Sequence, residues 1–185
     1  VKSVAEMENE NKILDFDTIQ EKRTDELMEL LDRRDMKQLQ RRMEEMNEFD
    51  VAEFLSELDS SRMPMVFRLL SKETAAEVFA NFDAPEQEEI INSITDSELA
   101  GIMDEMYVDD AVDMMEELPA NVVKRAMRTA TPATRNLINQ YLRYPDNSAG
   151  SIMTAEFIDL KKYMSVKESL ARIRRIGEDK ETIYV

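Results

Sequence analysis

The 185-residue sequence contains no cysteine and no histidine. The absence of cysteine excludes disulfide bonds and thiolate chemistry, and it is consistent with a reducing compartment. The absence of histidine removes the most frequent general base and the most frequent protein ligand of transition metals. The sequence also has no glycine-rich phosphate loop and no nucleophile elbow. Because its many carboxylates single out no catalytic pair, we expect no enzymatic activity.

Glycine, proline and long apolar runs are also scarce, with only 3 glycines and 5 prolines. No stretch of about 18 consecutive apolar residues and no secretory hydrophobic region is present, so we expect this piece to be soluble. Its length allows one domain of about 100 to 150 residues together with part of another.

An apolar pattern recurs every 24 residues and runs five times. In each copy, positions 4, 5 and 8 form one apolar step, and positions 16, 17 and 20 form a second. Only Arg34, Arg42 and Asn139 break this pattern, although 43% of the whole chain is hydrophobic. The copies begin with the segments 27–34, 51–58, 75–82, 99–106 and 123–130.

The i, i+1, i+4 spacing of each step places three side chains on one face of a helix. Each copy therefore predicts two short amphipathic helices, which are marginal alone and must bury their apolar faces on their neighbours. The sequence thus predicts a mainly α fold, a right-handed superhelix of short helices. Residues of the N-cap type precede the expected helices: Asn47, Asp59, Ser71, Asp83, Thr95 and Thr131.

Charge is distributed unevenly along the chain. Residues 1–119 carry 12 Lys and Arg against 33 Asp and Glu, a net charge of −21, whereas residues 120–185 carry a net charge of +5. Phosphate binding needs clustered Lys and Arg, so we expect no nucleic-acid partner. The acidic part is either a solvated surface or a surface that responds to cations, and composition leaves both interpretations open.

The pattern divides the chain into four segments. Residues 1–24 are a leader that includes a first helix, and residues 25–142 hold the repeats. Pro145 and Gly150 interrupt the pattern and indicate a hinge over 143–150. Residues 151–185 are expected to be the incomplete beginning of a second domain.

Within this second domain, residues 155–160 are expected to form a short strand. Residues 165–176 are expected to form a helix that opens with a capping box of Ser165 and Glu168. A further strand is expected to start at residues 181–185. These elements together cannot enclose a hydrophobic core.

The acidic repeats and the segment YPDNSAGSIMTAEFIDLKKYMSVKESLARIR at 144–174 resemble the MgtE family of bacterial magnesium channels. In that family a helical superhelix leads through a junction similar to AGSIMT at 149–154 into a pair of cystathionine-β-synthase (CBS) motifs and a membrane domain. The resemblance covers residues 25–185, and the junction is its specific part. It implies that the chain ends with the start of the first CBS motif.

The resemblance also implies a function, which is Mg²⁺ sensing. In the family, Mg²⁺ bound between the superhelix and the CBS motifs holds the closed channel, and its loss releases the superhelix. The corresponding Mg²⁺ ligands here are the side chains of Glu77, Asp109 and Asp113 and the backbone carbonyl of Ser151, where the family often has glycine. A carbonyl oxygen is retained whichever residue stands there.

The residues themselves allow other interpretations of these positions. Asp109 and Asp113 are i and i+4 on a helix, where an unneutralised like pair costs a few tenths of a kcal/mol. Asp109 lies in the first turn, where the helix dipole alone favours a negative charge. Glu77 stands beside an apolar step and is otherwise an ordinary solvent-facing residue. Mg²⁺ suits such oxygen donors because it keeps several of its waters.

The resemblance implies as partners a second copy of the chain, which pairs through the CBS motifs, the pore of the same chain and an adenine nucleotide at the CBS motifs. It places the chain at the cytoplasmic side of the bacterial membrane. Helical repeats alone also resemble the middle domain of a flagellar motor switch protein, so the alternative is an α-solenoid scaffold that binds a protein. A nucleotide-responsive module is a third possibility.

Overall fold

The computed structural model describes residues 22–145, 147–154, 157–177 and 180. Residues 22–32 are helical. The further helices are α2 (Met36–Glu44), α3 (Glu48–Ser56), α4 (Met63–Phe67), α5 (Lys72–Ala80), α6 (Ala84–Ser93), α7 (Asp96–Glu105), α8 (Val108–Glu117), α9 (Ala120–Thr129), α10 (Pro132–Tyr141), the 3₁₀ turn η1 (Ala149–Ser151) and α11 (Val166–Ile176). Among these residues no helix is long and apolar enough to cross a membrane.

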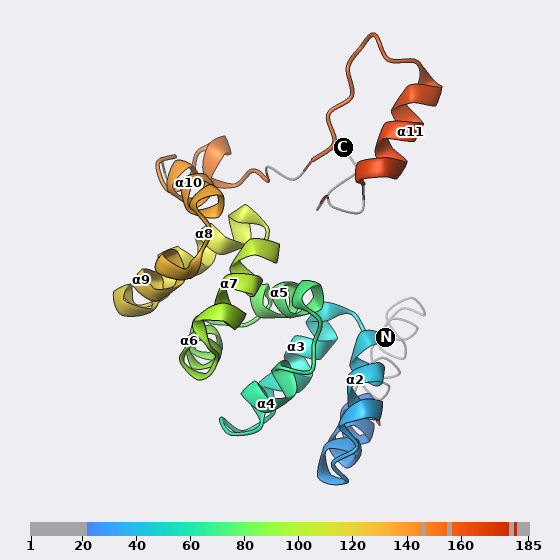
Figure 1. The fold of residues 1–185 in the computed structure, drawn as a ribbon, viewed down its shortest axis with the longest axis vertical. Coiled ribbons are helices and arrows are strands. Elements are labelled where there is room, and N and C mark those ends of the chain that lie inside the picture. The colour runs from blue at the N-terminus through green and yellow to red at the C-terminus, as the bar shows by residue number, and fades with distance from the viewer. Residues whose placement is uncertain (1–21, 146, 155–156, 178–179, 181–185) are drawn as a thin grey trace, which may run out of the picture.

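The helices stack in two rows, as the 24-residue repeat predicts. Helix α5 packs between α3 and α7, and α7 packs in turn against α9. The second row consists of α4, α6, α8 and α10, each in contact with the next. Figure 1 shows the resulting superhelix from α2 to α10, with α11 lying apart beyond its end.

The apolar steps of the repeat form the core of the superhelix. All of their apolar residues are buried or packed against the core except Leu142, which is 40% exposed. Phe67, Phe79 and Phe82 pack together in the middle of the stack, with ring centroids 6.1 to 6.5 Å apart. The mainly α superhelix is therefore confirmed, and its stability comes from packing between successive copies.

The expected N-caps are formed at five of the six positions. The side chains of Asn47, Ser71, Asp83, Thr95 and Thr131 each accept a hydrogen bond from the backbone at the start of the following helix. Asp59 also accepts backbone hydrogen bonds, but one turn before its helix begins. Its carboxylate accepts from the backbone N–H of Ser61 and Arg62 in a preceding turn, so α4 begins only at Met63.

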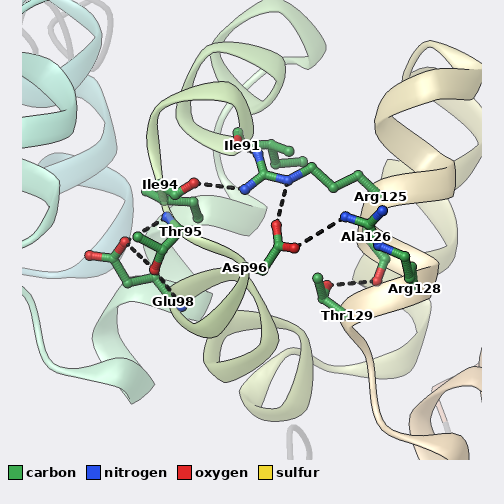
Figure 2. A network of polar contacts seen from close by, with 9 residues as sticks. All are labelled: Ile91, Ile94, Thr95, Asp96, Glu98, Arg125, Ala126, Arg128 and Thr129. Atoms are coloured by element: carbon green, nitrogen blue, oxygen red, sulfur yellow. Dashed lines mark hydrogen bonds and ion pairs between the residues drawn. The ribbon is translucent and has the colours of Figure 1, made fainter.

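Arginine side chains connect successive copies at their surface. Arg125 on α9 donates to Asp96 (2.9 Å) and to the carbonyl oxygens of Ile91 and Ile94 at the end of α6. Arg128 reaches the other oxygen of Asp96 at 3.1 Å. Figure 2 shows that both guanidinium groups extend from α9 to the junction between α6 and α7. These contacts satisfy carbonyl groups that a helix end leaves without an intrahelical donor.

The segment after α10 is built differently from the superhelix. The capping box of Ser165 and Glu168 opens α11 as expected. The strand expected over 155–160 was wrong for the residues that are described, because Phe157 makes a single bridge and 158–160 have no regular structure. A strand needs a partner ladder to persist. Residues 155, 156 and 181–185 of the two expected strands lie outside the described residues.

Candidate metal centre

One face of α8 carries three carboxylates in register. Asp109, Val112, Asp113 and Glu116 follow the i, i+3, i+4, i+7 spacing and so form one stripe along the helix. The opposite stripe of α8, which includes Ala111, Met114 and Met115, is buried in the superhelix. The burial of the apolar stripe therefore fixes the direction in which the carboxylates point.

A pocket of about 250 Å³ opens over this carboxylate face. Helix α10, which packs against α8, contributes Tyr141, and the chain after it contributes Tyr144. The remaining wall comes from residues 147–152, here called the returning segment because they bring the chain back to α8. The lining residues are Asp109, Val112, Asp113, Glu116, Tyr141, Tyr144, Asn147, Ser151 and Ile152.

The returning segment reaches α8 through two tight turns. Asn147 has a φ of 60°, in the left-handed region that asparagine tolerates better than most residues. The backbone N–H of Ser148 donates to Pro145 O at 3.1 Å, and that of Ser151 donates to Ser148 O at 3.2 Å. Ser151 closes the 3₁₀ turn η1 and lies in the pocket wall.

The structure thus brings together three of the four predicted ligand residues. Asp109 and Asp113 come from α8, and Ser151 comes from the segment that follows α10. Asp109 is half-buried, whereas Asp113 is exposed. Both Asp109 and Asp110 lie in the first turn of α8, as expected.

Glu77 does not line this pocket. It lies on the exposed face of α5, beside Glu48 on α3. Partial burial raises the pKa of Glu77, and the charge of Glu48 and a hydrogen bond with it raise this pKa further. The two carboxylates therefore form a second acidic pair, and the role of Glu77 as a ligand stays a prediction.

Sequence reasoning missed the other polar residues of the pocket. Glu116 could have been found, because it follows Asp113 by three positions and Asp109 by seven on the same helix face. Asn147 and Tyr144 gave no such signal, since their place in the wall depends on how the chain returns to α8.

The pocket offers oxygen donors alone, which is the chemistry that Mg²⁺ prefers. Among the described residues, no three Asp, Glu, His or Cys side chains are arranged as a complete metal site. Mg²⁺ retains several waters, and each water occupies about 30 Å³, so the pocket has room for a partly hydrated ion. The residues of the pocket that could hold such an ion are Asp109, Asp113 and Ser151, with water as its remaining ligands.

Residues 46–147 match the model of the family described as the MgtE intracellular N domain. The magnesium transporter MgtE of Thermus thermophilus is 32% identical over 170 residues, which cover 90% of this chain and 38% of the relative. The magnesium transporter MgtE of Bacillus subtilis is 18% identical over 141 residues, which cover 76% of this chain and 31% of that protein. The chain therefore spans less than two fifths of the length of either relative.

Two solved structures share the fold. The soluble part of a magnesium transporter superimposes with a TM-score of 0.81 at 23% identity, covering 89% of this chain and 65% of the other. The cytosolic domain of the Mg²⁺ channel MgtE in complex with ATP gives a TM-score of 0.75 at 31% identity, covering 87% and 66%. Since the family model covers more than half of its residues, from α3 to the pocket segment, the chain belongs to the MgtE family and contains its intracellular N domain.

Proposed function

We propose that this chain is the Mg²⁺-sensing regulatory region of a magnesium channel or transporter. The observation that carries the proposal is the pocket in which Asp109 and Asp113 of α8 meet Ser151 of the segment that follows the hinge. A cation bound there contacts both parts of the chain at once. The chain acts by binding and movement, with no catalytic step.

The physical basis of the response is the charge of the superhelix. Residues 1–119 have a net charge of −21, and Asp113 and Glu116 share the pocket with Asp109. Like charges on one helix face repel each other, and a divalent cation removes this repulsion. The ion favours the closed arrangement, in which Ser151 adds its oxygen, over the open one. Each tenfold difference in Mg²⁺ affinity between the two arrangements shifts the equilibrium between them by about 1.4 kcal/mol.

Loss of Mg²⁺ then frees the superhelix to move about the hinge at 143–150. The buried steps of the repeat hold α3 to α10 together, so the superhelix moves as one unit. In the longer protein this movement controls the pore. Glu77 is assigned to the same sensing surface, at the separate acidic pair that it forms with Glu48.

The proposed partners follow from the relatives. Two relatives are magnesium transporters, and one related structure is a channel domain in complex with ATP. We assign to the longer protein a pore that it gates, a second copy that pairs through the CBS motifs, and an adenine nucleotide at those motifs. The described part of the first CBS motif contains only α11 as a regular helix.

Limited proteolysis tests the sensing role directly. Arg143 lies in the hinge and is exposed, so trypsin can cleave after it. Millimolar Mg²⁺ is expected to slow the appearance of the fragment that begins at Tyr144, relative to NaCl of equal ionic strength, as followed by mass spectrometry. The double variant Asp109→Asn/Asp113→Asn is expected to lose this protection.

A matched control is available at the C-terminal end of α3, with Glu53 in the helix and Glu57 at its C-cap. Glu53 and Glu57 are also i and i+4 and exposed, but they lie away from the pocket. Glu53→Gln/Glu57→Gln makes the same change of charge and is expected to keep the Mg²⁺ protection. Equal protection in the wild type and in the Asp109/Asp113 variant would remove this pocket from the sensing mechanism.

A further inference from the structure

Gly150 lies against the ring of Tyr144. A Cβ atom added to Gly150 would stand 2.5 Å from Cδ1, 2.6 Å from Cγ and 2.9 Å from Cε1 of that ring. These separations are far below the ordinary contact distance of about 3.5–4.0 Å between carbon atoms. Any residue other than glycine at this position therefore has to displace either the ring or the 3₁₀ turn.

The ring of Tyr144 has little freedom to move away. It packs edge to face on Tyr141, with ring centroids 5.9 Å apart and an interplanar angle of 86°. Tyr141 is 5% exposed and belongs to the core at the end of α10. Both rings also line the pocket over α8. Because a packed core resists displacement of its side chains, we expect the 3₁₀ turn η1 to move instead of the Tyr144 ring.

The turn that contains Gly150 is short and internally bonded. Ser151 donates to Ser148 O from its backbone N–H at 3.2 Å and from its hydroxyl at 3.0 Å. Gly150 and Ser151 are consecutive residues of η1. A displacement of Gly150 from Tyr144 consequently also moves Ser151 relative to the carboxylate face of α8.

We propose that Gly150 is a positioning residue of the cation pocket, because its lack of a side chain lets η1 rest on the Tyr144 ring and sets Ser151 opposite Asp109 and Asp113. This inference rests on the proposed function and adds to it the device that aligns the two sides of the pocket. Tyr144 is the surface against which the turn is placed. The ligand is a hydrated divalent cation, for which Mg²⁺ is the probe.

The variant Gly150→Ala tests the contact, and Gly101→Ala is its matched control. A Cβ at Gly101 on α7 would meet only methylene groups of Lys72 at 3.6 Å or more, which is ordinary contact. We expect Gly150→Ala to weaken Mg²⁺ binding about tenfold in calorimetric titration, the range found when a group that orients a metal ligand is lost. Gly101→Ala is expected to bind as the wild type does, and both variants are expected to keep the wild-type helical content.

A second variant separates the steric contact from a general loss of stability. In a Tyr144→Ala background the ring is absent, so Gly150→Ala is expected to cause a smaller loss of Mg²⁺ affinity than in the wild type. Equal losses in the two backgrounds would show that the ring does not mediate the effect, and they would overturn the proposal.

Spin labels provide a measurement that needs no Mg²⁺. The chain has no cysteine, so Glu117→Cys on α8 and Met153→Cys beyond η1 can be labelled uniquely. Gly150→Ala is expected to shift or broaden the distance distribution between these labels in the presence of EDTA. An unchanged distribution overturns the positioning role.

The outcomes distinguish the two proposals. If Asp109→Asn/Asp113→Asn abolishes Mg²⁺ binding while Gly150→Ala binds normally, the positioning role is wrong and the sensing function stands. If the Asp109/Asp113 variant binds Mg²⁺ as tightly as the wild type does, the sensing function at this pocket is wrong. The role of Gly150 in the pocket is then wrong as well.

Discussion

The carboxylates at two helix surfaces of the molecule differ in whether they form ion pairs with arginine. At the start of α7, Asp96 is paired with Arg125 and Arg128, which reach it from α9 (Figure 2). On α8, among the described residues, neither Asp113 nor Glu116 takes part in an ion pair with Lys or Arg. The first surface is neutralised within the chain, whereas Asp113 and Glu116 on the second keep their negative charge.

The difference in ion pairing arises from the side chains that the neighbouring helix places against each surface. Ion pairs between copies recur at a sequence separation of about 30 residues, as between Arg62 and Asp32 or between Arg68 and Glu98. Helix α10 faces α8 with Ile138 and Tyr141, which supply apolar contact instead of positive charge. Surface ion pairs contribute about 0 to 1 kcal/mol each, so the repeat can omit one without losing its fold.

The largest expected effect is the loss of Arg125. Arg125→Ala removes the hydrogen bonds to Asp96 and to the carbonyl oxygens of Ile91 and Ile94. Hydrogen bonds from a charged group contribute about 1.5–3 kcal/mol, so we expect the free energy of unfolding to fall by about 2–3 kcal/mol. Calorimetry should then show a Tm lower by roughly 5–10 °C.

Lys124→Ala is the control for Arg125→Ala. Lys124 is exposed on the same helix and makes no ion pair within the described part of the chain. Its replacement removes the same charge and should change the free energy of unfolding by less than about 0.5 kcal/mol. Equal effects of the two variants would mean that net charge, and not the contacts of Arg125, stabilises this junction.

A smaller effect on the free energy of unfolding is expected when a lysine is introduced on the carboxylate face of α8. Glu116→Lys places an ammonium group three residues after Asp113, near the C-terminal end of the helix, where positive charge is favoured. Without Mg²⁺, the variant should be more stable than the wild type by about 0.5–1 kcal/mol at low salt, as measured by urea unfolding. Millimolar Mg²⁺ should stabilise it less than it stabilises the wild type.

Glu117→Lys is the matched control for Glu116→Lys. Glu117 is the next residue, is exposed and does not line the pocket. It should retain the response to Mg²⁺, although its charge change is identical. If both variants lose the response equally, a diffuse charge effect accounts for it, and the contrast between the two surfaces does not hold.

The smallest expected effect concerns the pKa of Asp96. Hydrogen bonding from Arg125, followed by the charges of Arg125 and Arg128, holds the pKa of this carboxyl below its usual range. Its contribution to stability is therefore complete above the pKa of the unfolded chain and is lost as the pH falls through the lower pKa of the folded state. Arg125→Gln should raise this pKa, as followed by carboxyl carbon NMR titration.

Arg128→Gln provides the comparison for that measurement. The Arg128 side chain is 70% exposed, against 23% for Arg125, so solvent screens its charge more strongly. A smaller rise of the Asp96 pKa is expected in Arg128→Gln than in Arg125→Gln. The reverse order would show that Arg128 is the main partner of Asp96.

Much of the fold could be predicted from the sequence because the signals are local and repeated. The apolar steps specify which face of each helix is buried, as Phe79 and Ile90 illustrate, both fully buried. The caps at Ser71 and Thr95 specify where helices begin. Asp59 caps a turn that precedes α4 instead of the helix itself. Among the described residues of the segment 155–160, only Phe157 makes a bridge.

The candidate site could be predicted only in part. The pair Asp109 and Asp113 was visible as an i, i+4 spacing, and Ser151 and Glu77 were suggested by the family resemblance alone. The structure places Ser151 with the aspartates and leaves Glu77 beside Glu48. The variants of Asp109, Asp113 and Gly150 test three of these residues, Ser151 through its neighbour Gly150, and the role of Glu77 stays a prediction.

The sequence by itself determined a stack of short helices with an acidic surface, since helix periodicity, capping and charge depend on residues within one or two turns of each other. Only the tertiary structure decided which carboxylates lie in a pocket and which are neutralised by arginine. That decision depends on residues about 30 to 40 positions apart, such as Asp113 and Ser151. Their approach depends on how α10 packs on α8 and on the turns that follow α10, and helix packing has no local signature in the sequence.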